Sequence, residues 1–243
     1  CSTAAMCYAE FSSALPIAGS AYSFGNVVFG EIVGWFLGWA LILEYMLSVA
    51  AVSTGFSAYF NSLLAGFGIH LPKAITGPFD PVNGTFINLP AVLIVLFIAY
   101  VLSRGLRTSM TINSIVVVIK IAIIILFLLV GMFYVKPANW DPFMPFGTKG
   151  VLVGAAQVFF AYLGFDVVAS SAAEVKEPAK NMPRGIIGTL AICTLLYILV
   201  SIVLTGMISY TKLNVADPVS FALYAVKQNW VAGIISVSAL AGM

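Results

Sequence analysis

The chain has 243 residues, of which 61% are hydrophobic and 8% are charged, and its formal net charge is +2. A soluble domain carries about 25% charged residues and needs polar groups to cover its outside, so this composition excludes an ordinary soluble protein. The positive charges form no run that could follow a phosphate backbone, and nucleic acid is therefore not expected as a partner.

Seven apolar stretches are long enough, or can be extended, to cross a bilayer, which takes about 20 residues. They lack the alternating pattern of barrel strands, and backbone groups in lipid must be paired within a segment. We therefore predict an all-α membrane protein, a polytopic helical bundle with residues 1–243 in one transmembrane domain. The expected spans are 1–18, 32–64, 89–103, 111–135, 151–175, 186–209 and 230–243. The first and last spans are cut by the chain ends, which predicts a fragment of a longer protein.

The connecting loops predict the orientation of the bundle. The loops at 19–31, 104–110 and 176–184 share one side and hold all three arginines within short segments. Short, positively charged loops stay in the cytoplasm, so we place this side there and expect a multi-pass protein of the cytoplasmic (plasma) membrane. In the opposite loop at 210–228, Asp217 and Pro218 precede an apolar pattern that predicts a short surface helix.

The first two spans contain two acidic residues and a row of glycines. Gly30, Gly34 and Gly38 are four residues apart, so they line one helix face and allow close helix contact. Glu44 lies about 20 Å along its helix from the start of the span, near mid-membrane. It is a candidate proton carrier or counter-charge for a cationic substrate, and a protonated structural glutamate is an equal alternative. Glu10 is interpreted as structural.

Lys120 interrupts a long uncharged stretch in the span at 111–135. It lies about 13 Å from the start of this span, too deep for its ammonium to reach the surface easily.

A charge inside the membrane is costly and marks a functional candidate. We expect Lys120 to face the bundle interior, paired with a carboxylate or with backbone carbonyls. Its role is either a coupling cation in a transport cycle or a static structural pair.

Asp166 lies in the next span at a similar expected depth, so it can pair with Lys120 directly or through water. The alternative is that Asp166 caps the second half of a broken helix.

The segment 159–166, with the sequence FFAYLGFD, is the predicted working site. A glycine among aromatic residues, followed by a charge, favours a break in the helix, and a break at membrane depth is tolerated only where it lines a cavity. The free carbonyls at such a break attract an ammonium and the free amides attract a carboxylate, so the two together suit a zwitterionic amino acid. A continuous helix with ordinary aromatic packing is the alternative.

The sequence FFAYLGFDVVASSAAEVKEPAKNMPR at 159–184 resembles the sixth helix and following loop of amino acid–polyamine–organocation permeases. Its loop motif EVKEP at 174–178, followed by Pro183, matches the family pattern. Residues 8–22 resemble the second helix and its cytoplasmic turn. Glu44 and Lys120 fall where the bacterial relatives of cationic amino acid transporters carry a glutamate and a lysine.

This resemblance implies a fold of two inverted five-helix repeats that works by alternating access, of which the chain holds helix two to the start of helix eight. It implies substrate contacts along the sixth helix, a gating role for Phe160, and a Lys120 that occupies the place of a coupling sodium ion. The function implied is sodium-independent amino acid transport, by proton-coupled symport or by exchange. The expected substrate-binding residues are Phe159, Phe160, Ala161, Leu163, Gly164 and Glu44, and the expected coupling residues are Lys120 and Asp166.

Two other functions compete with transport as readings of this sequence. A membrane-embedded enzyme would need a nucleophile and base or a metal set, and His70 has no visible partner for either. A sensor or channel would need polar stripes along a pore. Cys1, Cys7 and Cys193 lack metal-ligand spacing, so we expect neither metal nor cofactor, and no enzyme. The expected partners are a small amino acid, protons and membrane lipid. No pattern indicates an oligomeric state, an accessory subunit, or whether the amino acid is cationic or neutral.

Overall fold

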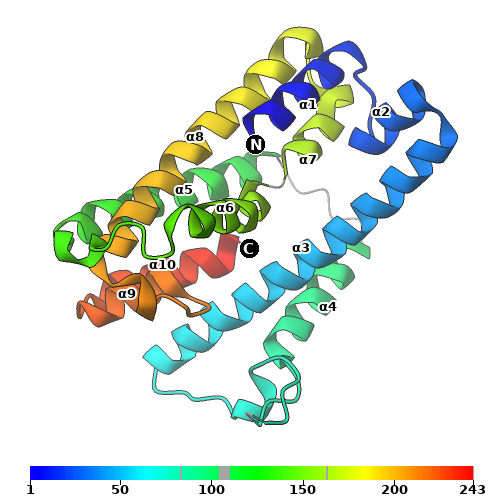
Figure 1. Cartoon of the computed structure of the whole chain (residues 1–243). Coiled ribbons are helices and arrows are strands. Elements are labelled where there is room, and N and C mark those ends of the chain that lie inside the picture. The colour runs from blue at the N-terminus through cyan, green and yellow to red at the C-terminus, as the bar shows by residue number, and fades with distance from the viewer. Residues whose placement is uncertain (83, 104–109, 163, 243) are drawn as a thin grey trace. The chain divides into compact units, whose positions relative to one another are not determined.

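A computed structural model describes residues 1–82, 84–103, 110–162 and 164–242. Its helices in chain order are α1 (Ser2–Ala14), α2 (Ser20–Phe29), α3 (Glu31–Gly66), α4 (Leu89–Ser103), α5 (Met110–Met132), α6 (Gly147–Val158), α7 (Phe165–Ser170), α8 (Pro178–Met207), α9 (Pro218–Ala225) and α10 (Asn229–Gly242) (Figure 1). Short 3-10 turns are η1 (Lys73–Ile75), η2 (Pro137–Trp140), η3 (Phe159–Tyr162), η4 (Ser171–Glu174) and η5 (Tyr210–Lys212). Within these ranges no strand is present, which confirms the all-α prediction.

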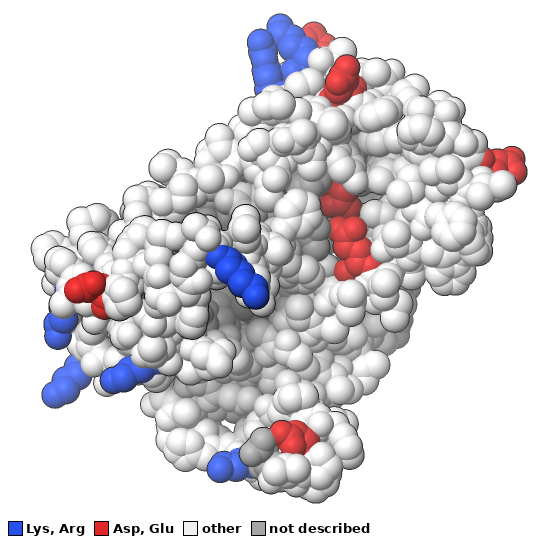
Figure 2. Space-filling model, in the orientation of Figure 1, with Lys and Arg blue, Asp and Glu red and all other residues white. Residues whose placement is uncertain are grey.

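Three helical stretches of the described chain are long and apolar enough to cross a membrane, by length and composition. They are Glu31–Gly66, Gly147–Ala173 and Pro178–Met207, and most of their side chains are not buried within the structure. Shorter apolar helices occupy Leu89–Val101, Val116–Met132 and Asn229–Gly242. Figure 2 shows a surface that is mainly uncharged. An uncharged exterior suits a helical protein whose solvent is lipid.

The predicted cytoplasmic loops differ from the structure in their local conformation. The segment 19–31 was predicted as a loop but is mostly the helix α2, bounded by Gly19 and Gly30 with φ of 113° and 89°. Helix α8 begins at Pro178, inside the predicted loop 176–184, because a proline at the first helical position lacks only an N–H that has no helical partner. The predicted turn at 104–110 lies, except for its last residue, outside the described residues.

The chain divides into two compact units. Unit 1 comprises Cys1–Met46 and Pro142–Ile198, and unit 2 comprises Leu47–Asp141 and Leu199–Met243. The long helices α3 and α8 therefore each contribute one part to unit 1 and the other to unit 2.

The core of unit 1 is built from small side chains. Ala5 and Ala9 lie one turn apart on α1, and together with Ala169 and Ala172 they form a fully buried cluster around Phe24 of α2. Met182 and Ile186 of α8 complete the cluster. Because alanine adds so little bulk, the backbones of α1 and α7 can approach closely, and α7 is held firmly despite its length of six residues.

Helix α2 packs closely against glycines on the first turns of α3, as the spacing of small residues predicted. A Cβ atom added to Gly34 would lie 2.9 Å from Cβ of Asn26, and one added to Gly38 would lie 3.1 Å from Cδ2 of Tyr22. Gly30 does not join this contact, since a Cβ there would meet nothing within 4 Å. It instead permits the positive φ between the two helices.

Unit 2 has its own core where α5 and α8 meet α9 and α10. Phe127, Leu128, Val203, Met207 and Leu223 are among its buried residues. The C-terminal ends of α5 and α8 are in close contact, because a Cβ added to Gly131 would lie 2.5 Å from Cγ1 of Val203.

A second contact between these two helix ends centres on the backbone of Gly206. Its carbonyl oxygen accepts hydrogen bonds from the backbone N–H of Lys136 at 2.9 Å and from Nδ2 of Asn139 at 2.7 Å. Trp140 lies over the same glycine, with Cζ2 at 2.9 Å from the position of a Cβ, and its Nε1 donates to Oγ1 of Thr205. We call this group of contacts the Gly206 corner.

Candidate functional site

The helix that begins with α6 is interrupted at the predicted place. It ends at Val158, η3 covers Phe159–Tyr162, and α7 begins at Phe165 after Gly164, whose φ is 124°. A Cβ on Gly164 would meet nothing within 4 Å, so the backbone conformation rather than space favours glycine there. This result confirms the discontinuous helix and rules out the alternative of an unbroken one.

Tyr197 of α8 occupies the carbonyl side of this break. Its hydroxyl donates to the backbone oxygen of Ala161 at 2.9 Å. Its ring also meets the ring of Tyr162 edge to face, with centroids 5.2 Å apart. One of the carbonyls released by the interrupted helix is therefore already bound by a side chain from a neighbouring helix.

Asp166 lies in the first turn of α7 and is only 4% exposed. Its Oδ2 accepts a hydrogen bond from the hydroxyl of Tyr45 on α3 at 2.5 Å. The alternative in which Asp166 caps the half-helix is wrong, because the N-cap position is Gly164 and has no side-chain cap. The carboxylate instead joins α7 to a helix more than one hundred residues away in sequence.

Two further ionisable side chains lie near this carboxylate. Glu44, next to Tyr45 on α3, interacts electrostatically with Asp166. Tyr8 of α1 is within electrostatic range of both acids. The structure thus gathers α1, α3 and α7 around a small acidic cluster of Tyr8, Glu44, Tyr45 and Asp166, all within unit 1.

Four of the six predicted substrate residues lie on this break, and Glu44 lies on α3. Phe159 and Phe160 are in η3, with exposed fractions of 41% and 44%, and Ala161 is exposed beside them. Leu163 lies outside the described residues. Their role in binding stays a prediction.

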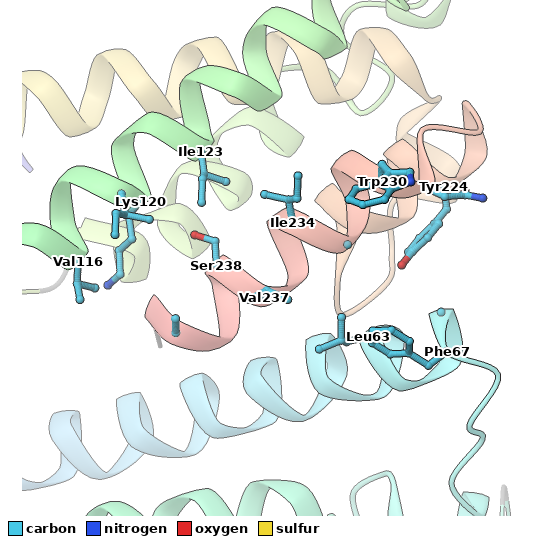
Figure 3. Close-up of a pocket in the computed structure, with 15 residues that line it drawn as sticks. Leu63, Phe67, Val116, Lys120, Ile123, Tyr224, Trp230, Ile234, Val237 and Ser238 are labelled. Carbon is cyan, nitrogen blue, oxygen red and sulfur yellow. The ribbon is translucent and has the colours of Figure 1, made fainter.

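Lys120 lies on α5 in unit 2 and reaches the end of α10 (Figure 3). Its Nζ donates to the carbonyl oxygen of Gly242 at 2.5 Å. A Cβ on Gly242 would meet the end of the Lys120 side chain, which shows how closely the lysine approaches the backbone of α10. A backbone carbonyl was one of the two kinds of partner expected for this ammonium.

The same lysine lines a cavity of about 750 Å³ between the end of α3, α5 and α10. The other lining is mainly apolar and includes Leu63, Phe67, Trp230 and Ile234. Figure 3 shows Ser238 of α10 on the cavity wall between Lys120 and Ile234.

The predicted pair of Lys120 with Asp166 joins residues of different units. Within its own unit each has another partner, Gly242 for the lysine and Tyr45 for the aspartate. The pairing stays a prediction. Across the described residues, no group of three or more His, Cys, Asp or Glu side chains is arranged to hold a metal ion.

Comparison of the whole chain with known protein families gives a match. The amino acid permease model matches residues 1–243. The chain belongs to the amino acid permease family. This membership confirms the resemblance seen in the sequence, and it makes the chain part of an integral membrane protein of this family.

Relatives of this permease chain include transporters of bacteria and of eukaryotes. It is 58% identical to the methylthioribose transporter and 51% identical to the branched-chain amino acid permease BcaP, both of Bacillus subtilis (strain 168), over 100% of this chain and 53% of each relative. It is 34% identical to the human cationic amino acid transporter 4, over 99% of this chain and 39% of that protein. The chain thus spans about half the length of the bacterial relatives it matches.

Sequence patterns did not identify three tyrosines of the site: Tyr8, Tyr45 and Tyr197. A tyrosine in an apolar stretch is equally typical of a helix that faces lipid or of an aromatic belt, so the sequence offers no signal for its partner. The position of Tyr45 directly after the predicted Glu44 was the only available hint.

Proposed function

We propose that the complete protein carries amino acids across the cytoplasmic membrane by alternating access, without sodium, through proton-coupled symport or exchange. The observation that supports this most is the interrupted helix at 159–164 beside the buried carboxylate of Asp166, in a chain of the amino acid permease family. A break inside a membrane helix leaves backbone carbonyls and amides without helical partners, and these groups complement the ammonium and carboxylate of an amino acid.

The substrate site proposed here follows the carbonyl side of the break. Phe159, Phe160 and Ala161 supply its backbone, and Leu163 and Gly164 complete it. A carbonyl oxygen has two lone pairs, so the oxygen of Ala161 can accept a hydrogen bond from Tyr197 and one from a substrate ammonium. The half-exposed ring of Phe160 is the proposed gate over the bound substrate.

Electrostatic arguments support the remaining roles. Glu44 adds a second carboxyl group next to Asp166, and this negative site favours an ammonium or a proton. Lys120 provides a fixed positive charge that donates to a backbone carbonyl, the type of oxygen that would otherwise bind a sodium ion. We propose Asp166 as the group whose proton is coupled to transport, and Lys120 as the replacement for a coupling cation.

Uptake of radiolabelled amino acids into liposomes that contain the complete protein tests this function. We expect uptake without sodium, driven by a proton gradient or by amino acid loaded inside. Phe160→Ala should abolish uptake, and His70→Ala, in an exposed loop, should leave it unchanged. Absence of uptake for every amino acid under both driving conditions would contradict the proposal.

A second candidate substrate is methylthioribose, because one relative at 58% identity is named as its transporter. This sugar is uncharged, so it needs hydroxyl partners and an apolar surface but neither a carboxylate nor an ammonium site. Competition separates the two substrates. If excess methylthioribose blocks amino acid uptake no better than ribose does, the amino acid is the substrate; strong inhibition by methylthioribose, with direct uptake of the labelled sugar, would favour the alternative.

A further inference from the structure

The hydrogen bond between Tyr45 and Asp166 joins two helices that are far apart in sequence. Tyr45 lies on α3 with 41% of its side chain exposed, and its hydroxyl reaches a carboxylate that is 4% exposed. Among the described residues, Tyr45 is the side chain that donates to Asp166. A buried carboxylate is costly unless it is hydrogen-bonded, so this one hydroxyl strongly affects how Asp166 is held.

The strength of such a bond depends on the charge of the acceptor. A phenol that donates to an ionised carboxylate forms a short, charge-assisted bond, roughly twice as strong as one between neutral groups. When the carboxyl group takes up a proton, the assistance of the charge is lost. The contact between α3 and α7 therefore weakens when Asp166 becomes neutral.

Ionisable groups from two neighbouring helices face Asp166. From α3 it is faced by Glu44 and Tyr45, and from α1 by Tyr8. Helix α2, which also packs near α7, carries no charged residue. The hydrogen-bond donor that the structure gives the Asp166 carboxylate is therefore a hydroxyl.

We infer that Tyr45 is a positioning residue that acts as a charge-dependent latch: its hydroxyl holds α7 to α3 while Asp166 is ionised, and protonation of Asp166 releases the half-helix. This inference rests on the proposed function, because it explains how a coupled proton on Asp166 would change the contact between α3 and α7 at the broken helix. Helix α7 has only six residues and follows a glycine with positive φ, and its buried alanine lies at its C-terminal end, so the hydrogen bond of Asp166 is the side-chain contact of its first turn with α3.

The decisive variant is Tyr45→Phe in the complete protein, which removes the hydroxyl and keeps the ring. The purified variant should unfold at a lower temperature than the native protein at neutral pH, and the difference should shrink at acidic pH, where carboxylates take up protons. Tyr22→Phe on α2, an exposed tyrosine of the same unit, is the matched control and should show no such dependence on pH. An equal loss for Tyr45→Phe at both pH values means that the hydroxyl has a structural role only, and overturns the latch.

Transport provides the second measurement. Native uptake should depend on external pH, and Tyr45→Phe should lower uptake at neutral pH about tenfold and lose most of that dependence. The double variant Tyr45→Phe with Asp166→Asn should behave much like Asp166→Asn alone, because the charge-assisted bond to Tyr45 is already lost when the carboxylate is replaced by a neutral amide. Native transport that ignores pH, or a Tyr45→Phe protein that transports like the native one, overturns the latch and leaves amino acid transport standing. A native protein that takes up no amino acid, while Tyr45→Phe still shows the pH-dependent loss of stability, contradicts the proposed function alone.

Discussion

Asp166 in unit 1 and Lys120 in unit 2 are both ionisable side chains, and groups of different kinds form hydrogen bonds with them. In unit 1 the partner of Asp166 is the hydroxyl of Tyr45, a side chain. In unit 2 the partner of Lys120 is the backbone carbonyl of Gly242. A side-chain partner can be removed by substitution, so the charge of Asp166 is open to tuning. The partner of Lys120 cannot be removed in this way, and its contact depends on where the backbone lies.

We expect the largest loss of net amino acid uptake from removal of the Lys120 side chain in unit 2. Lys120→Ala should reduce net amino acid uptake by about 100-fold or more, because a charge that takes part in the cycle has no substitute. Folding should change little, since the carbonyl of Gly242 is a neutral acceptor. Liposome uptake together with thermal unfolding measures both quantities.

The exposed residue Lys180, in the first turn of α8, serves as the control for this change, and Lys180→Ala should transport normally. Sodium-dependent uptake by the native protein would show that Lys120 does not replace a coupling cation. Normal net uptake by Lys120→Ala would assign the lysine a structural role.

An intermediate effect is expected at the backbone of the break in unit 1. Gly164→Ala forces an L-residue into φ of 124°, which costs about 1–3 kcal/mol, and should lower both the free energy of unfolding and uptake. Gly188→Ala is the control, because Gly188 lies within α8 with open space around it, where alanine gains about 0.5–1 kcal/mol. Two glycine variants of equal stability would mean that the positive φ at Gly164 is not needed.

The smallest effect is expected at the Gly206 corner in unit 2. Asn139→Ala removes one hydrogen bond to the carbonyl of Gly206 and should lower the free energy of unfolding by about 1 kcal/mol. Asn181→Ala removes a bond of similar length from an exposed site, to the backbone oxygen of Lys176, and should cost less. Chemical unfolding of the two variants measures the difference, and a larger loss for Asn181→Ala would contradict the importance of the corner.

Much of the fold was predictable because lipid imposes a simple rule on the sequence. Long apolar stretches had to be helices, and the structure has helices at each predicted span. The break at Gly164 was also predictable, since a glycine between aromatic residues and an aspartate weakens a helix and permits a positive φ. Helix α2 was missed because its ten residues are too few to span a membrane and contain serine and asparagine, which are typical of loops.

The partners of the charged groups were not predictable. Asp166 was expected to pair with a lysine or to cap its own helix, and neither pattern points to a tyrosine on α3. Contacts between helices depend on how each helix is rotated and tilted, and an apolar membrane helix has little amphipathic pattern that would fix its rotation. For the same reason the role of Tyr197 was not predictable. Its partner is a backbone oxygen that is available as an acceptor because the helix is broken.

The Gly206 corner limits the ways in which α5 can move. One carbonyl oxygen accepts both the backbone of Lys136 and the side chain of Asn139, and the indole of Trp140 covers the glycine. If α5 moves while these contacts are kept, it has to rotate about the Gly206 corner. Within unit 2, the C-terminal end of α5 is therefore the fixed end of that helix.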